Sequence, residues 1–202
     1  MYTLSKETWT TRNMVKISVL GVISFVLMFF ELPLPWLAPA FMKLDISDLP
    51  ALIGSFALGP MAGVIIQLLK NVLNVLIEGT TTGGVGELAN FVVGSVFAYT
   101  AGFVYFKEKT FNRAVVGLVL GTITMTIGIT LANYFVMFPL YAKLMGQDLQ
   151  VFVDMGAMIN KNIVDLRSMM LWAIVPFNLL KGIMLTALTL LIYKRVSPIL
   201  HK

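Results

Sequence analysis

Lys181 and Asn178 are polar residues at the centre of an otherwise apolar run, Met169–Tyr193. Three residues separate them, so on a helix they share one face. An ionised side chain at mid-bilayer costs at least about 2.5–3.5 kcal/mol, which makes a lysine there a candidate functional residue. Pro176 lies beside them and leaves one backbone carbonyl of the helix without its usual donor. The pattern predicts a polar binding surface; the alternative is a lysine that only pairs with a neighbouring helix.

A second polar group interrupts the run Pro60–Ile77. Gln67, Lys70 and Asn74 share one helix face there, and Asn71 lies next to it. A lone asparagine more often joins two helices through a hydrogen bond. Four polar groups within eight residues instead favour a wet cavity. We therefore expect Lys70 and Asn74 to belong to a binding site.

Three more polar residues complete that candidate site. Asn133 lies inside the run Ala114–Tyr141, and Glu87 and Asn90 stand one helical turn apart at the beginning of Val85–Phe106. Amides, ammonium groups and a carboxylate near aromatic residues suit a flat heterocycle whose edge alternates donors and acceptors and whose tail carries hydroxyl groups. These residues predict a site for a small polar aromatic solute between the helices, nearer the external face.

The whole chain is too apolar for a soluble protein. Of its 202 residues, 58% are hydrophobic and 12% are charged, and the mean hydropathy is +0.87. Soluble domains have about 45–50% apolar and about 25% charged residues. The chain has no cysteine, and its one histidine, His201, is next to last, which excludes cysteine or histidine chemistry inside the protein. We predict a single membrane-embedded substrate-binding domain, residues 1–202.

Six apolar runs are candidates for membrane-spanning helices. A helix needs about 20 residues to cross a hydrocarbon core about 30 Å thick, so the second run, with ten residues, is too short to cross upright. The predicted fold class is an all-α integral membrane protein, a bundle of six transmembrane helices of which the second is short. The runs are Met14–Leu32, Leu49–Leu58, Pro60–Ile77, Val85–Phe106, Ala114–Tyr141 and Met169–Tyr193.

The charged residues between these runs predict the orientation. With both termini in the cytoplasm, the cytoplasmic side holds nine basic and two acidic residues, and the external side holds four basic and eight acidic ones, when charged residues at the ends of the runs are counted with the nearer side. Basic residues collect on the cytoplasmic side of membrane proteins. The other two of the 15 basic residues are Lys70 and Lys181, inside the spans. We therefore predict that both termini are cytoplasmic.

Three segments are then external: Pro33–Asp48, Glu78–Gly86 and Ala142–Arg167. Within the third, the pattern of Leu149–Ile159 predicts either an amphipathic helix or lid, or a solvated loop. The glycine-rich stretch Gly79–Gly86 lacks the Gly-Lys-Ser/Thr ending of a phosphate-binding loop. It is interpreted as a flexible external turn.

Small residues repeat on several of the predicted helices. Gly117 and Gly121 are four residues apart, a spacing that allows two helices to pack closely. In the first run, Ser18, Gly21 and Ser24 are spaced by three and lie roughly on one face, near the cytoplasmic end. That face either packs inside the bundle or receives a partner protein.

Several short motifs occur in a specific order. They are KLDISDLPALIG (Lys43 to Gly54), Gly59-Pro60-x-x-Gly63, Lys70-Asn71, GELANF (Gly86 to Phe91), Asn133 and Asn178-x-x-Lys181. The series resembles the substrate-binding subunits of energy-coupling factor vitamin transporters, above all their riboflavin-specific members. The resemblance covers residues 14–195.

The resemblance implies a subunit in the plasma membrane of a prokaryote that captures riboflavin, or its phosphate FMN, from outside. It implies no catalytic cofactor, no enzymatic activity and no nucleic-acid partner. Such subunits dock through their first helices on a transmembrane coupling subunit (EcfT) that carries two cytoplasmic ATPases (EcfA and EcfA′). The family often has an Ala-x-x-x-Ala row for this docking, where this chain has Ser18, Gly21 and Ser24.

Roles in the site follow from the resemblance and from side-chain chemistry. The two asparagines and the lysine in the last two spans agree with positions that contact the flavin ring in the riboflavin-specific members. For the hydroxylated tail, or for closing the entrance, we expect Asp45, Glu87 and Asn90; for apolar walls, Leu44 and Trp172.

Two other classes of function stay open. One is a carrier of the same fold for thiamine, folate or a queuosine precursor. The other is a small membrane enzyme, such as a phosphatase or acyltransferase, which would have to use Glu87, Asp45 and Asp48. The chain has no nucleotide-binding motif, and every Asp and Glu maps to a loop or the end of a span. Since a proton-driven carrier usually places a carboxylate at mid-membrane, we expect uptake to depend on partner ATPases.

Overall fold

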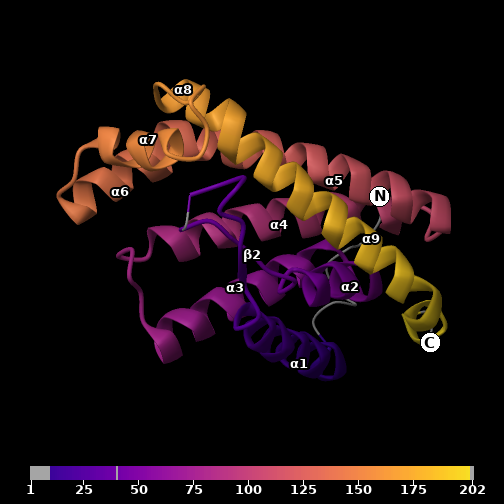
Figure 1. Ribbon diagram of the computed structural model, residues 1–202. Coiled ribbons are helices and arrows are strands. Elements are labelled where there is room, and N and C mark those ends of the chain that lie inside the picture. Colours follow the sequence, from indigo (N-terminus) through magenta and orange to yellow (C-terminus); the bar gives the residue numbers. More distant parts are fainter. Residues whose placement is uncertain (1–9, 40, 201–202) are drawn as a thin grey trace.

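The protein is a bundle of long helices (Figure 1), described here from a computed structural model that covers residues 10–39 and 41–200, with the backbone alone for 194–200. Two short strands, β1 (Leu32–Pro33) and β2 (Lys43–Leu44), and two π-helices, η1 (Asn133–Met137) and η2 (Met170–Ile174), accompany the α-helices. The α-helices are α1 (Thr11–Met28), α2 (Leu49–Leu58), α3 (Pro60–Glu78), α4 (Val85–Phe106), α5 (Phe111–Ala132), α6 (Phe138–Met145), α7 (Leu149–Ala157), α8 (Leu166–Met169) and α9 (Val175–Leu200).

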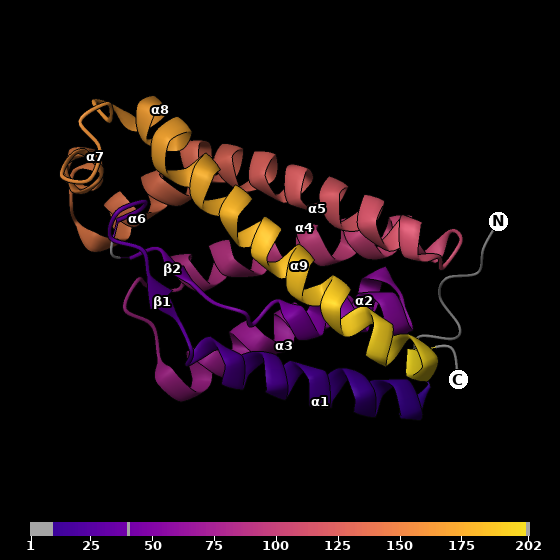
Figure 2. The same cartoon turned by 45° about the vertical axis from the view of Figure 1, so that its right-hand side comes forward.

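Five helical stretches in the described part of the chain are long and apolar enough to cross a membrane: Thr11–Met28, Pro60–Glu78, Val85–Phe106, Phe111–Met145 and Leu166–Tyr193. The all-α membrane fold and the short second helix are confirmed. The helix α1 begins and α9 ends at the same end of the bundle, opposite α6, α7 and α8 (Figure 2). The six crossings and the cytoplasmic side of the termini stay predictions, and Lys6, Glu7, His201 and Lys202 lie outside the described residues.

The first helix is shorter than the apolar run suggests. It ends at Met28, because the residues that follow form a two-stranded antiparallel sheet in which Leu32 pairs with Leu44 and Pro33 with Lys43. An ion pair between Glu31 and Lys43 lies beside this sheet. The hairpin leads the chain from α1 back into the bundle.

The short helix α2 lies inside the bundle, in contact with α1, α3, α4 and α9. Ten residues extend about 15 Å, half of a hydrocarbon core about 30 Å thick. At its C-terminal end, Phe56 stacks on Tyr105 with a centroid distance of 4.4 Å. Asp48, the N-cap residue just before α2, is therefore buried, with 1% of its surface exposed, and Asp45 is 8% exposed. Both residues lie in the loop between β2 and α2, as the sequence predicts, but this loop is folded into the protein and its carboxylates are buried.

Two of the segments that are predicted to be external have the expected local structure. Residues Leu149–Ala157 form α7, so the amphipathic-helix alternative is confirmed, and its Phe152 and Val153 are buried. The stretch after α3 is a turn in which Gly79, Gly83 and Gly84 have positive φ angles, a conformation that favours glycine.

The close packing of α4 and α5 depends on Gly117. A Cβ atom added there would lie 2.6 Å from the carbonyl oxygen of Ala101, whereas one added at Gly128, on the same helix, would meet nothing within 4 Å. We expect Gly117→Ala to lower the unfolding free energy by about 1–3 kcal/mol through overpacking. Gly128→Ala should leave stability unchanged or raise it by up to about 1 kcal/mol. Thermal unfolding of both variants in detergent checks this, and equal midpoints would contradict the observed packing.

Candidate functional site

Two adjoining cavities open at the end of the bundle that carries α6 and α7. The inner cavity has a volume of about 170 Å³ and the outer one about 1100 Å³. The residues that line both are Phe41, Lys43, Asp45, Gly86, Asn90 and Tyr141. Since the two share so much of their lining, we treat them as one site with a narrow inner part and a wide outer part.

The inner cavity brings together the three residues that the sequence assigns to ring contacts, Asn133, Asn178 and Lys181. The amide nitrogen Nδ2 of Asn178 donates to the carbonyl of Ile174 at 2.8 Å, which leaves its amide oxygen without a donor among the described residues. The side chain of Asn133 makes no hydrogen bond to a described residue and is 8% exposed. The ammonium group of Lys181 and two amides with unused bonding capacity therefore face the same small space.

Apolar side chains enclose this polar edge. They come from the segment before β2 and from α4, α5, α6, η2 and α9. They are Phe41, Met42, Val93, Ile129, Phe138, Ile174 and Phe177. A narrow cavity with aromatic and aliphatic walls and a few convergent polar groups is typical of a site for a flat heterocycle.

Both asparagines lie next to a π-helix. Asn133 begins η1, and Asn178 donates its hydrogen bond to the last residue of η2. Each π-helix ends two residues before a proline, Pro139 or Pro176. Proline has no backbone N–H and disturbs the preceding helical turn, and π-helical turns occur often at functional sites. The prolines were the signal from which both irregularities could have been predicted.

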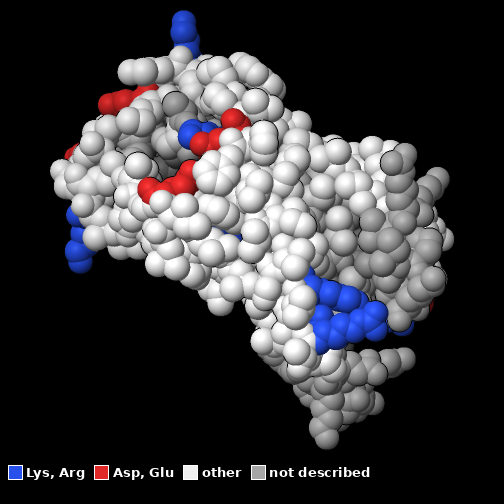
Figure 3. Space-filling view, turned by 90° about the horizontal axis from the view of Figure 1, so that it is seen from below, with Lys and Arg blue, Asp and Glu red and all other residues white. Residues whose placement is uncertain are grey.

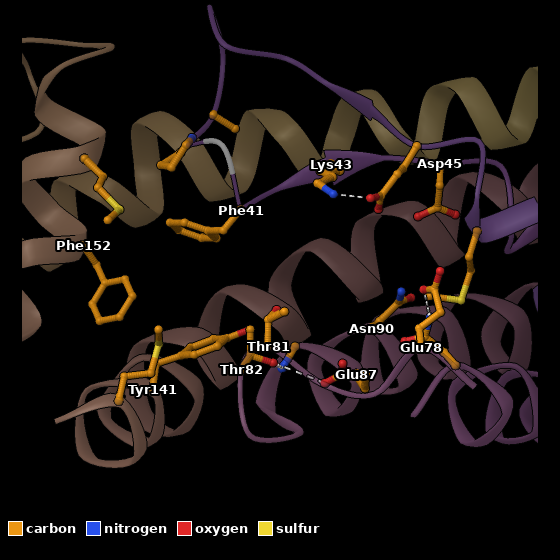
Figure 4. Close-up of a pocket in the computed structure, with 18 of the residues that line it drawn as sticks. Phe41, Lys43, Asp45, Glu78, Thr81, Thr82, Glu87, Asn90, Tyr141 and Phe152 are labelled. Carbon is orange, nitrogen blue, oxygen red and sulfur yellow. Dashed lines mark hydrogen bonds and ion pairs between the residues drawn. The ribbon is translucent and has the colours of Figure 1, made fainter. Parts of the chain in front are cut away.

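The outer cavity has an aromatic side and an acidic side (Figure 4). Phe41, Tyr141 and Phe152 gather at one end of the view, Glu87 lies near its middle beside Thr82, and Glu78 lies toward the other end. In the space-filling view, acidic side chains border a hollow on this face of the molecule (Figure 3).

Neutral donors surround the two glutamates. Glu87 Oε2 accepts hydrogen bonds from the hydroxyl groups of Thr80 at 3.1 Å and Thr82 at 3.2 Å, and Glu78 Oε2 accepts one from Asn74 at 2.7 Å. Neither glutamate forms an ion pair with any lysine or arginine among the described residues. The outer cavity can accept hydrogen bonds from ligand hydroxyl groups, and its negative charge opposes an anionic ligand.

Lys70 lies behind the cavities and lines neither of them. It is fully buried, and its Nζ atom donates to Asp48 at 2.6 Å, to Ser47 at 3.0 Å and to Asn90 at 3.2 Å. Of the four polar residues that the sequence singles out between Gln67 and Asn74, only Asn74 lines a cavity. Lys70 was expected to face a wet cavity. Its ammonium group instead faces the carboxylate of Asp48, just before α2.

The remaining expected wall residues are not brought to the site. Leu44 lies in β2 and lines neither cavity, and Trp172, in η2, is 50% exposed. Sequence reasoning missed Phe41, Tyr141 and Phe138 as wall residues. Their apolar character did not distinguish them from the many aromatic residues that simply face lipid or the core.

The three small residues of α1 do not form one exposed face. Ser18 is exposed, Gly21 packs against Leu69 of α3, and the buried Ser24 donates to the carbonyl of Ser47 at 2.8 Å. Three residues of an α-helix rotate the side-chain direction by about 300°, which is about 60° short of a full turn. Two such steps separate Ser18 from Ser24, so their side chains point about 120° apart. Gly21 and Ser24 follow the internal alternative.

A different row of α1 faces outward. It is a stripe of four valines at a spacing of three and four residues, each about half exposed: Val15, Val19, Val22 and Val26. This spacing keeps all four side chains on one face of the helix.

The sequence and geometry converge on one family of membrane proteins. Residues 12–193 match the family model for the substrate-specific component of ECF transporters, the energy-coupling factor transporters. The chain belongs to this family. As a substrate-specific component it is part of a transporter rather than an enzyme, which sets aside the phosphatase and acyltransferase alternatives.

Individual relatives agree. The component is 35% identical to the riboflavin transporter RibU of Staphylococcus aureus over 191 residues, 95% of this chain and 93% of the relative. It is also 35% identical to the riboflavin transporter FmnP of Bacillus subtilis over 188 residues, 93% of each chain. A solved structure, described as the S component of a bacterial ECF transporter, superposes with a TM-score of 0.72 at 35% identity, covering 95% of this chain and 98% of the other. The component is a multi-pass protein of a prokaryotic plasma membrane.

Proposed function

We propose that this substrate-specific component binds riboflavin at the external side of the membrane and hands it to an ATP-driven transporter. The observation that carries the proposal is the inner cavity, where the Lys181 ammonium and the amides of Asn133 and Asn178 face one space with apolar walls. The edge of a flavin ring alternates hydrogen-bond donors and acceptors, and an amide offers one of each. Relatives that share 35% of the residues are riboflavin transporters.

The volumes of the two cavities indicate which part of riboflavin each one holds. About 170 Å³ suits part of a vitamin-sized molecule, because ligand pockets usually measure about 300–1000 Å³. The ring belongs in the inner cavity, and the ribityl tail belongs in the outer one. There, Asp45, Glu87 and Asn90 offer acceptors to its hydroxyl groups.

The partners in this proposal are a transmembrane coupling subunit (EcfT) and two cytoplasmic ATPases (EcfA and EcfA′). Membership of the ECF family supports an energy-coupling partner. The chain has no Gly-x-x-x-x-Gly-Lys-Ser/Thr loop that could bind a nucleotide. ATP hydrolysis must therefore take place on another protein.

Equilibrium dialysis of the purified chain against riboflavin, thiamine, folate and a queuosine precursor tests the choice of vitamin. We expect saturable retention of riboflavin alone. Retention of one of the other compounds in its place would show that the fold carries a different vitamin.

Phosphorylation of the tail should weaken binding. A phosphate monoester carries about −1.5 to −2 charges at pH 7 and would enter the outer cavity near Glu78 and Glu87, so we expect FMN to bind about tenfold more weakly than riboflavin. Glu78→Gln/Glu87→Gln should narrow that ratio, while Glu108→Gln, in an exposed ion pair with Arg113, should not. Titrations with riboflavin and FMN measure the ratio of the two dissociation constants. A ratio that the double substitution leaves unchanged would contradict this account of the outer cavity.

A further inference from the structure

The charges buried behind the inner cavity form one connected cluster. Asp45, Asp48, Lys70 and Lys181 are 8%, 1%, 0% and 5% exposed, respectively. Two carboxylates and two ammonium groups balance one another. Buried charges are costly unless each one is paired and hydrogen-bonded, so the removal of any one of them unbalances the other three.

Asp48 is the partner that both lysines share. Its Oδ1 atom accepts hydrogen bonds from Lys70 at 2.6 Å and from Gln67 at 2.8 Å. Its Oδ2 atom lies 2.9 Å from Nζ of Lys181, in an ion pair that is not aligned as a hydrogen bond. Lys181 donates a hydrogen bond to Oδ2 of Asp45, at the longer distance of 3.4 Å. Asp48 is thus the nearer anchor of the ammonium group that faces the ligand cavity, although Asp48 itself lines neither cavity.

Lys70 ties the same cluster to the cavity wall. It donates to Ser47 at 3.0 Å and to Asn90, which lines both cavities, at 3.2 Å. The backbone N–H of Ser47 in turn donates to Asp45 at 2.7 Å. The ammonium group of Lys70 therefore holds the segment that carries Asp45 through Ser47, from the side away from the cavities. No ligand in either cavity would touch this ammonium group.

We infer that Asp48 and Lys70 are positioning residues for the ligand: they fix the place of the Lys181 ammonium group in the inner cavity and hold the segment that carries Asp45. The inference rests on the proposed riboflavin binding and adds two specific residues to it. The physical cause is the shared carboxylate. Without it, Lys70 loses its one ion pair among the described residues and Lys181 keeps Asp45 alone, so the ammonium of Lys181 moves from its place.

Substitution of Asp48 gives the first expected result. Asp48→Asn keeps the shape of the side chain and removes its charge, and we expect riboflavin binding to weaken at least about tenfold. Adding Lys70→Met restores the balance of charge and leaves the pair of Lys181 and Asp45 intact. The double variant Asp48→Asn/Lys70→Met should therefore bind more tightly than Asp48→Asn alone.

A double-mutant cycle with Lys181→Met separates positioning from general stability. If Asp48 acts through Lys181, Asp48→Asn should lower the affinity for riboflavin at least about tenfold in the natural chain. In a chain that already carries Lys181→Met, the same substitution should lower the affinity by less than about threefold. Thermal midpoints in detergent confirm that each variant is folded. If Asp48→Asn alone does not fold, the charge-balanced variant Asp48→Asn/Lys70→Met replaces it, both in the natural chain and in the Lys181→Met chain. The loss of riboflavin affinity should again be smaller in the Lys181→Met chain.

The control is Glu108→Gln, which breaks an exposed ion pair on a segment that lines neither cavity and should leave affinity unchanged. Equal losses in the two backgrounds, with riboflavin bound by the natural chain, would overturn the positioning role and leave the proposed function standing. A natural chain that binds no riboflavin would overturn both.

Discussion

Replacement of Lys181 by methionine is expected to weaken riboflavin binding by about ten- to a hundredfold while the bundle stays folded. The ammonium group faces the inner cavity, and a hydrogen bond from a charged donor contributes about 1.5–3 kcal/mol. Methionine has a similar length and removes only the charge. Asp48 keeps Lys70 as a partner in the variant, so one of the two carboxylates next to Lys181 stays paired.

The matched control for this substitution is Lys143→Met. Lys143 lies on α6, is exposed, and lines neither cavity, so the same chemical change there should leave the dissociation constant unaltered. Titration of flavin fluorescence against each purified variant measures the effect. An unchanged dissociation constant for Lys181→Met would remove Lys181 from the binding site.

Bulky substitutions on the outer face of α1 are expected to abolish uptake without loss of binding. The family-based expectation is that the first helices dock on the coupling subunit, and the exposed row of α1 consists of valines, among them Val19 and Val22. Tryptophan at both positions adds bulk that should prevent a helix of the coupling subunit from packing closely against this face, because closely packed membrane helices need side chains that let their backbones approach. Cells that carry Val19→Trp/Val22→Trp should accumulate almost no riboflavin, while the purified variant binds it within about threefold of the natural chain.

The control for this experiment lies on α5, where Val116 and Val119 are 45% and 47% exposed, close to the 53% and 51% of Val19 and Val22. Val116→Trp/Val119→Trp should leave uptake intact, since it places the same bulk on a different helix. Uptake at the natural rate by the α1 variant would show that this face is not the docking surface. Gly21→Leu is a poorer test, because a side chain at Gly21 would collide with Leu69 inside the bundle.

Sequence periodicity predicted the parts of the site that lie on single regular helices. Asn178 and Lys181 reach the same cavity because three residues are nearly one turn of α9, and Glu87 and Asn90 do so for the same reason on α4. The apolar runs likewise predicted α2, and they predicted α4 to the residue. These features depend on local geometry, which a sequence carries directly.

The burial of charged residues within the bundle was not predictable in the same way. Asp48 reads as a loop residue, yet it lies at the level of two buried lysines, because α2 is about 15 Å long and begins in the middle of the bundle. For the same reason Lys70, which sequence reasoning placed in a wet cavity, is paired with a carboxylate instead. The sequence argument on energy coupling did not count a buried carboxylate, and the structure shows that Asp48 is one, paired with two ammonium groups.

The central claim is that this chain alone captures riboflavin, and fluorescence titration of riboflavin with the purified protein, free of any partner subunit, tests it most directly. If the ring binds in the inner cavity as proposed, aromatic side chains contact it, so we expect the flavin fluorescence to be quenched and the quenching to saturate at one flavin per chain. An excess of a non-fluorescent analogue with the same ring edge should displace riboflavin and reverse the quenching. Thiamine and folate should not reverse it. Fluorescence that stays unchanged through a stoichiometric excess of folded protein would contradict the claim.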